Sequence, residues 1–110
     1  MKKIFIVITL VLVFSSCASA AVYKGQKIFI KKCVECHDKR QKFVSQKTTY
    51  EWEFFMRDKG KELANVHLKD ENAKKSWNYF SSPSYSEKVK HLEDFLLEYA
   101  KDSGNVPACN

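Results

Sequence analysis

The stretch GQKIFIKKCVECH, residues 25–37, contains Cys33 and Cys36 with a histidine, His37, directly after the second cysteine. A C-x-x-C-H pattern of this kind is found in covalent haem attachment sites, in redox-active dithiols and in zinc sites. Two thiols on one turn can each form a thioether with a vinyl group of a porphyrin, and the adjacent imidazole can then bind the iron. The cellular compartment and the surrounding structure decide between the three.

The N-terminus predicts export. Residues 1–20, MKKIFIVITLVLVFSSCASA, combine a basic start, an apolar stretch and small residues near the end, as a secretory signal peptide does. The apolar stretch is too short to span a bilayer as a mature helix. We expect cleavage after Ala20, which leaves residues 21–110 as one domain in the bacterial periplasm. Cys17 follows a loose version of the lipoprotein cleavage box, so a lipid anchor on Cys17 is an alternative.

The charge of the expected mature chain is mildly positive. Two of the 19 basic residues lie within residues 1–20, so 17 basic residues face 13 acidic ones, a net charge of +4. The charges are interspersed, whereas a nucleic-acid-binding protein would show a denser basic stripe, so we expect no nucleic-acid partner. A mild positive charge suits docking onto acidic surfaces of partner proteins.

The cysteine count favours a cofactor over a disulfide framework. The expected mature chain is small enough that its core is marginal unless something adds to it. It has three cysteines, an odd number, in a compartment that oxidises thiols. One covalent haem would use Cys33 and Cys36 and would add to the core. Cys109 would then be left as a free thiol, a dimer disulfide or a bond to another protein.

The apolar spacing predicts an all-α domain of about four helices. We expect a first helix from Tyr23 to about Lys32, leading into the cysteine motif. A capping residue precedes or opens each later helix. These helices are expected over residues 49–63 with Thr49 as cap, over residues 70–80 with Asp70 as cap, and from Ser86 to an end at Gly104.

Residues 25–37 resemble the N-terminal helix and haem site of class I cytochromes c. In that family a glycine, an aromatic residue four positions later and the first cysteine four positions further on occur together, as Gly25, Phe29 and Cys33 do here. The resemblance implies that the C-terminal helix crosses the first helix at Gly25, where a side chain would hold the two apart. It also implies that Phe29 and Tyr99 pack near each other, and that one haem c is attached through Cys33 and Cys36 with His37 as the proximal iron ligand.

The chain departs from the family at the distal iron ligand. The family carries a methionine on the loop before the last helix, but residues 81–86, SSPSYS, contain neither Met nor His. His67 is the preferred distal ligand, since imidazole suits iron and its neighbours are apolar. Met56, on the apolar face of the second helix, is the alternative. His91 is expected to be solvated, and an open position beneath Tyr85 or a water is the remaining possibility.

These expectations describe a periplasmic carrier of single electrons in a respiratory chain, and not an enzyme. Lysines that could meet an acidic redox partner lie along the first helix at positions 24, 27, 31 and 32. A haem-based sensor or gas-binding protein with an open sixth coordination position is the first alternative. A zinc or dithiol protein is the second. The dithiol reading needs a strand before the motif and the zinc reading needs two further ligands, and the sequence suggests neither.

Overall fold

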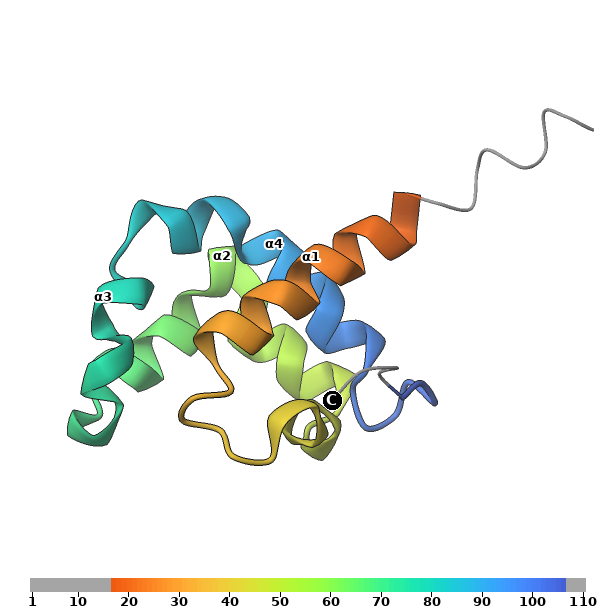
Figure 1. Cartoon of the computed structure of the whole chain (residues 1–110), viewed down its shortest axis with the longest axis horizontal. Coiled ribbons are helices and arrows are strands. Elements are labelled where there is room, and N and C mark those ends of the chain that lie inside the picture. The colour runs from red at the N-terminus through yellow and green to blue at the C-terminus, as the bar shows by residue number, and fades with distance from the viewer. Residues whose placement is uncertain (1–16, 107–110) are drawn as a thin grey trace, which may run out of the picture.

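The computed structural model describes residues 17–106, and within them every regular element is helical. The all-α prediction is therefore confirmed at that level. The described residues form four α-helices and two 3-10 helices (Figure 1). Their bounds are α1 Cys17–Lys32, η2 Arg40–Gln46, α2 Thr49–Leu68, η3 Glu71–Ser76, α3 Trp77–Phe80 and α4 Pro83–Glu98. No helix in the described part is long and apolar enough to cross a membrane.

Two sequence expectations fall on the ends of the chain. Residues 1–16, which hold most of the expected signal peptide, and residues 107–110, which include Cys109, lie outside the described residues. The backbone of Cys17 opens α1, which continues past Ala20 without a break.

Helix α1 crosses α4 at Gly25, as the resemblance implied (Figure 1). Gly25 is buried, and a Cβ atom there would overlap the carbonyl group of His91 and lie 2.7 Å from Cβ of Phe95. One turn further along α1, the Phe29 ring packs against Phe95 with ring centroids 5.4 Å apart. Tyr99 in turn contacts Phe95 at 5.3 Å. Phe29 and Tyr99, which the resemblance placed near each other, thus both pack on the ring of Phe95, one turn before Tyr99.

The N-cap residue of α2 lies one position earlier than expected. Thr48, and not Thr49, is the N-cap, because its hydroxyl accepts from the amide of Glu51 while the Glu51 carboxylate accepts from the amide of Thr48. This reciprocal pair is a capping box. The Thr49 amide and hydroxyl instead both donate to the carboxylate of Asp102, at 2.7 Å each, which ties the C-terminal segment to the start of the helix.

The same helix is broken in the middle and runs on to Leu68, beyond the expected end at Leu63. Four residues, 57–60, have non-helical backbone angles, and Asp58, Lys59 and Gly60 all have positive φ, at 52°, 58° and 70°. The left-handed conformation costs an L-residue roughly 1–2 kcal/mol. The bend therefore persists only because tertiary contacts favour it.

The remaining helix boundaries follow their capping residues. Asp70 is the N-cap of η3, as expected, because its carboxylate accepts from the amide of Asn72. The single helix expected over residues 70–80 is instead a 3-10 helix followed by a short α-helix. Helix α4 begins at Pro83, three residues before the predicted start at Ser86, because Ser82 accepts from the amide of Tyr85 and Pro83 takes the first helical position. It ends at Glu98, before the predicted stop at Gly104.

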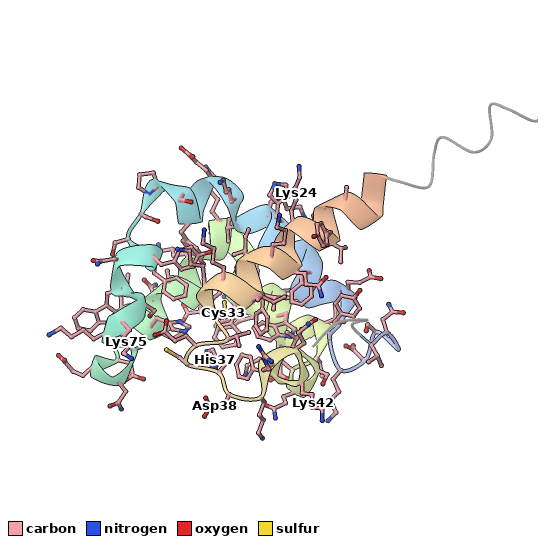
Figure 2. All side chains as sticks on the ribbon, in the orientation of Figure 1. Lys24, Cys33, His37, Asp38, Lys42 and Lys75 are labelled. Carbon is pink, nitrogen blue, oxygen red and sulfur yellow. The ribbon has the colours of Figure 1, made fainter. Side chains whose placement is uncertain are left out.

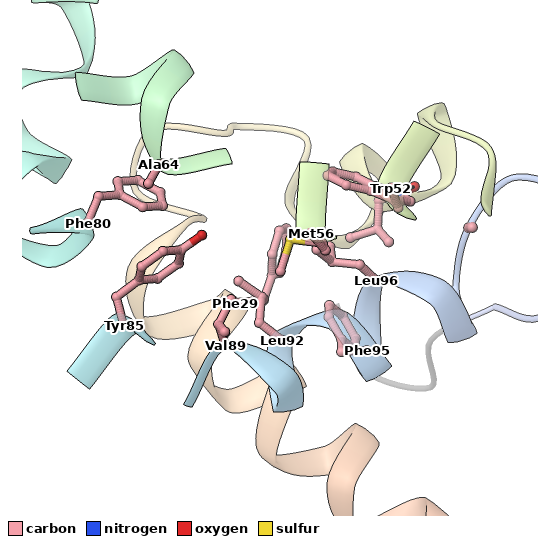
Figure 3. Packing of buried hydrophobic residues seen from close by; sticks show 12 residues of the cluster. Phe29, Trp52, Met56, Ala64, Phe80, Tyr85, Val89, Leu92, Phe95 and Leu96 are labelled. Carbon is pink, nitrogen blue, oxygen red and sulfur yellow. Dashed lines mark hydrogen bonds between the residues drawn. The ribbon is translucent and has the colours of Figure 1, made fainter. Parts of the chain in front are cut away.

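The core lies between α1, α2 and α4 (Figure 3). Trp52 is one of its largest members, and its indole nitrogen donates to the carbonyl oxygen of Val44 in η2 at 2.8 Å. Helix η2, which the sequence did not suggest, is held to the core through this bond and through the fully buried side chain of Val44.

Candidate functional site

The cysteine motif forms a compact turn at the end of α1. The carbonyl oxygen of Phe29 accepts from the amides of Cys33 and Val34, and the carbonyl oxygen of Cys33 accepts from the amides of Cys36 and His37. These bonds continue the helical winding through the motif. Cys33, Cys36 and His37 thereby all line one cavity, and Figure 2 shows Cys33 and His37 on the turn that follows α1.

This cavity has a volume of about 350 Å³, within the range of roughly 300–1,000 Å³ that is usual for small-molecule and cofactor sites. Its walls come from α1, the motif, η2, both halves of α2, η3, α3 and α4. The apolar lining residues are Phe29, Phe43, Trp52, Phe55, Leu63, Val66, Ala73, Phe80, Leu92 and Leu96, and the polar ones outside the motif are Lys32, Lys47, His67, Asp70, Asn72 and Ser76. A mostly apolar cavity with a few polar groups is typical of cofactor binding.

His37 is half-buried, and its ring stacks on Phe43 with centroids 4.0 Å apart. Burial lowers the pKa of His37 below its usual value, and the nearby His67 lowers it further. A lowered pKa favours the neutral imidazole, which is the form that binds a metal ion.

His67 lies in the last turn of α2, where two contacts fix its ring. Its Nδ1 lies 2.7 Å from the carbonyl oxygen of Leu63, and because that oxygen can only accept, Nδ1 carries the proton. The ring stacks on Phe80 at 4.3 Å, and the Trp77 indole donates to the backbone carbonyl of His67 at 2.8 Å. In the neutral ring, the lone pair is therefore on Nε2. A ring nitrogen bonded to a backbone carbonyl is the usual partner arrangement of a metal-binding histidine.

The rings of His37 and His67 lie close together at the cavity. Their centroids are 6.2 Å apart and their planes are nearly perpendicular, at 79°. Imidazole nitrogens bind metals at about 2 Å, so one metal atom between two imidazoles would separate the ring centroids by roughly 6 Å. The observed spacing fits that arrangement.

The other candidates for a distal ligand lie elsewhere. Met56 is 1% exposed and belongs to the core, but it does not line the cavity. His91 lies half-buried on α4, beside Gly25, and is likewise absent from the lining. The Tyr85 hydroxyl is directed to the carbonyl oxygen of Gly60 in the bend of α2. Among the distal candidates named from the sequence, His67 alone lies at the cavity.

The thiols of Cys33 and Cys36 are both free. Burial, with a contribution from Cys36, raises the pKa of the Cys33 thiol to about 12. Redox-active dithiols have the opposite property, a lowered pKa that supplies thiolate at neutral pH. Within residues 17–106 there is no group of three or more His, Cys, Asp or Glu residues that could hold a metal ion, whereas a structural zinc site uses four such ligands.

Sequence reasoning missed the aromatic residues that support the two histidines. Phe43 stacks on His37 and Phe80 on His67, and both lie at the cavity. The apolar spacing predicted a helix over residues 70–80, but it could not indicate which ring Phe80 would contact. Of the four α1 lysines, Lys32 lines the cavity, and Lys27, Lys31 and Lys32 also border a second, smaller cavity with Lys88.

Comparisons with protein-family models, curated proteins and solved structures find no match for this chain.

Proposed function

We propose that this chain is a small monohaem c-type cytochrome of the class I kind, exported to the periplasm, that carries single electrons between larger redox proteins. The observation that carries the proposal is the pairing of His37 and His67 at an apolar cavity, with ring centroids 6.2 Å apart, beside the thiols of Cys33 and Cys36.

Four side chains would hold the haem. Cys33 and Cys36 would attach the haem through thioether bonds to its vinyl groups. His37 would bind the iron as the proximal ligand and His67 as the distal one. The bound haem supplies a one-electron couple at its iron. Histidine as the second axial ligand gives a lower potential than methionine would, so the proposed carrier belongs to the low-potential range.

The chain's own residues set the surroundings of that couple. Phe43 and Phe80 back the two imidazoles and limit their rotation. The apolar walls exclude water, and low polarity disfavours the more highly charged oxidation state. No residue is assigned a bond-making role, because an electron carrier requires only binding, orientation and burial of its cofactor.

The lysines of α1 offer a surface for an acidic redox partner. Lys24 (labelled in Figure 2), Lys27 and Lys31 are exposed, as is Lys32 at the edge of the cavity. None of these four lysines forms an ion pair within the described part of the chain. Unpaired positive charge near a redox centre increases the rate of encounter with a negatively charged partner.

The proposal is tested by expressing the full chain, with its signal peptide, in a bacterium that has haem-attachment machinery. The purified periplasmic protein should show the sharp reduced absorption bands of a low-spin c-type haem that survives denaturation. A variant with Cys33→Ser and Cys36→Ser should accumulate without covalent haem. A colourless wild-type protein from the same host would overturn the proposal and favour a thiol or zinc protein.

The same spectra separate the carrier from a haem-based sensor. A sensor with an open sixth position would be high-spin and would change its absorption on addition of carbon monoxide. The proposed carrier, with His67 on the iron, should remain low-spin and respond weakly to that gas.

A further inference from the structure

The break at residues 57–60 divides α2 into two parts, one that carries Met56 and one that carries His67. Met56, just before the break, is buried in the core, whereas His67, after it, lies at the cavity. The two positions are eleven apart, about three turns of an unbroken α-helix, and would then point in the same direction. The bend at residues 57–60 is therefore what sends the two side chains to different places.

The bend has an unfavourable backbone and little local support. Asp58 and Lys59 adopt the left-handed conformation that non-glycine residues avoid, and both are exposed. Gly60 is the buried member of the left-handed stretch. Whatever holds the bend must act at Gly60.

Tyr85 contacts Gly60 directly. Its hydroxyl donates to the carbonyl oxygen of Gly60 at 2.5 Å, in a buried hydrogen bond between residues 25 apart in the chain. Helix α4 lies so close that a Cβ atom on Gly60 would overlap the Tyr85 hydroxyl and lie 2.7 Å from Cγ2 of Val89. Tyr85 is itself 4% exposed, so its position is fixed by the core.

Tyr85 also reaches His67 by a second route, through a ring. The edge of Tyr85 packs against Phe80, with centroids 5.0 Å apart and planes at 73°, and Phe80 stacks on the imidazole of His67 at 4.3 Å. Figure 3 shows Phe80 and Tyr85 side by side at one end of the core, away from Trp52. Tyr85 thus supports both the backbone that carries His67 and the ring that backs it, without touching His67.

We infer that Tyr85 is the positioning residue for His67: its hydroxyl holds the bend of α2 at Gly60, and its ring holds Phe80 against the imidazole. The inference rests on the proposed function in that His67 is taken as the distal ligand. It adds that Tyr85 on α4, by holding the bend of α2, determines whether His67 occupies the sixth coordination position of the iron.

The test compares Tyr85→Phe with Tyr99→Phe in the purified holoprotein. Both variants lose one hydroxyl from the C-terminal part of the chain, but Tyr99 contacts Phe95 and not the bend. Loss of one buried hydrogen bond should raise the high-spin fraction of Tyr85→Phe roughly fivefold over the wild type. Added imidazole should restore the low-spin spectrum, and Tyr99→Phe should remain as the wild type.

The high-spin fraction distinguishes positioning from general stabilisation. If Tyr85 were only a core residue, Tyr85→Phe would unfold at a lower temperature while its folded form kept the wild-type spectrum and imidazole response. That result would overturn the inference. If Tyr85→Phe does not accumulate, the same change is made in an Asp58→Gly background, where glycine relieves the strain of the bend. A wild-type spectrum in that double variant would also overturn the inference.

A failure of the proposed function gives a different result. A wild-type protein without haem would refute the carrier, and Tyr85 is then tested on the same chain by the NMR signals of the His67 ring. Tyr85→Phe should shift or broaden these signals, and Tyr99→Phe should not. Unchanged His67 signals would refute the role of Tyr85 by itself.

Discussion

Gly25 and His91 lie in direct contact where α1 crosses α4, with no room between them for a side chain. A Cβ atom on Gly25 would overlap the backbone carbonyl of His91, and a backbone group cannot rotate away as the end of a side chain can. The crossing packs Phe29 against Phe95 and sets the direction in which α1 delivers the cysteine motif to the cavity.

Gly25→Ala should therefore destabilise the protein. Alanine favours the helix by about 1 kcal/mol relative to glycine, but forcing α1 and α4 apart costs roughly 1–3 kcal/mol or more. We expect a net loss of about 1–2 kcal/mol in the free energy of unfolding, measured by chemical denaturation. Lys24→Ala, at the adjacent exposed position, should change that free energy by less than about 0.5 kcal/mol. Equal effects of the two changes would contradict the close crossing.

His67→Ala and Met56→Leu distinguish the two distal-ligand candidates. In the holoprotein His67→Ala should convert the low-spin spectrum to a high-spin one and raise the midpoint potential, because the iron loses a strong ligand. Met56→Leu should keep the wild-type spectrum, since Met56 lies in the core away from the cavity. Its cost should be only a stability loss below about 1.5 kcal/mol, as for other volume-conserving core changes. A high-spin Met56→Leu protein would reverse the assignment.

The Asp102 carboxylate should stabilise the folded protein at neutral pH and lose this effect at acid pH. Hydrogen bonds from the hydroxyl and amide of Thr49 hold the pKa of the Asp102 carboxyl below its usual value. The folded state then binds fewer protons than the unfolded state, so this stabilisation is present above the usual carboxyl pKa and is lost as the pH falls through the lowered one. Thermal unfolding of wild type and Asp102→Asn should differ at neutral pH and converge at acid pH. A gap that stays constant with pH would exclude the ionised carboxylate as its source.

The ion pair between Glu35 and Lys75 should add little to stability. It joins the cysteine motif to η3 at 3.7 Å, but both side chains are more than two-thirds exposed, at 71% and 77%. Exposed pairs contribute roughly 0–1 kcal/mol and are screened by salt. Lys75→Gln should shift the free energy of unfolding by less than about 0.5 kcal/mol, with no difference from the wild type at high salt. A larger, salt-resistant loss would mean that Lys75 acts through packing.

The helices could be predicted where local chemistry alone places them. The apolar spacing placed the end of α1 at Lys32, although the helix begins at Cys17 and not at Tyr23. Asp70 marked the start of the segment after α2, as observed. The start of α2 was displaced by one residue, although a local signal separates the two threonines. Glu51 lies three residues after Thr48 and completes its capping box, whereas Thr49 binds the distant Asp102.

The bend of α2 could not be predicted from local signals. The apolar spacing predicted an unbroken helix over residues 49–63, and one glycine inside such a pattern is usually tolerated. Two exposed residues, Asp58 and Lys59, take left-handed angles against their own preference. Tertiary contact overrides that preference, because the hydroxyl of Tyr85 and the close approach of Val89 reach Gly60 from a helix that begins more than twenty residues later.

The sequence by itself determined the all-helical class and the grouping of Cys33, Cys36 and His37 on one turn, because both depend on residues within a few positions of one another. The crossing at Gly25 joins residues far apart in the chain and was expected only from the family resemblance. Only the tertiary structure decided which residue lies opposite His37. The predicted second helix ended at residue 63 and left His67 outside it, whereas the observed helix continues past a bend at residues 57–60 to Leu68 and carries His67 in its last turn. The contact that holds this bend joins residues far apart in the chain and opposes the local backbone preference. Such a contact leaves no local pattern in the sequence.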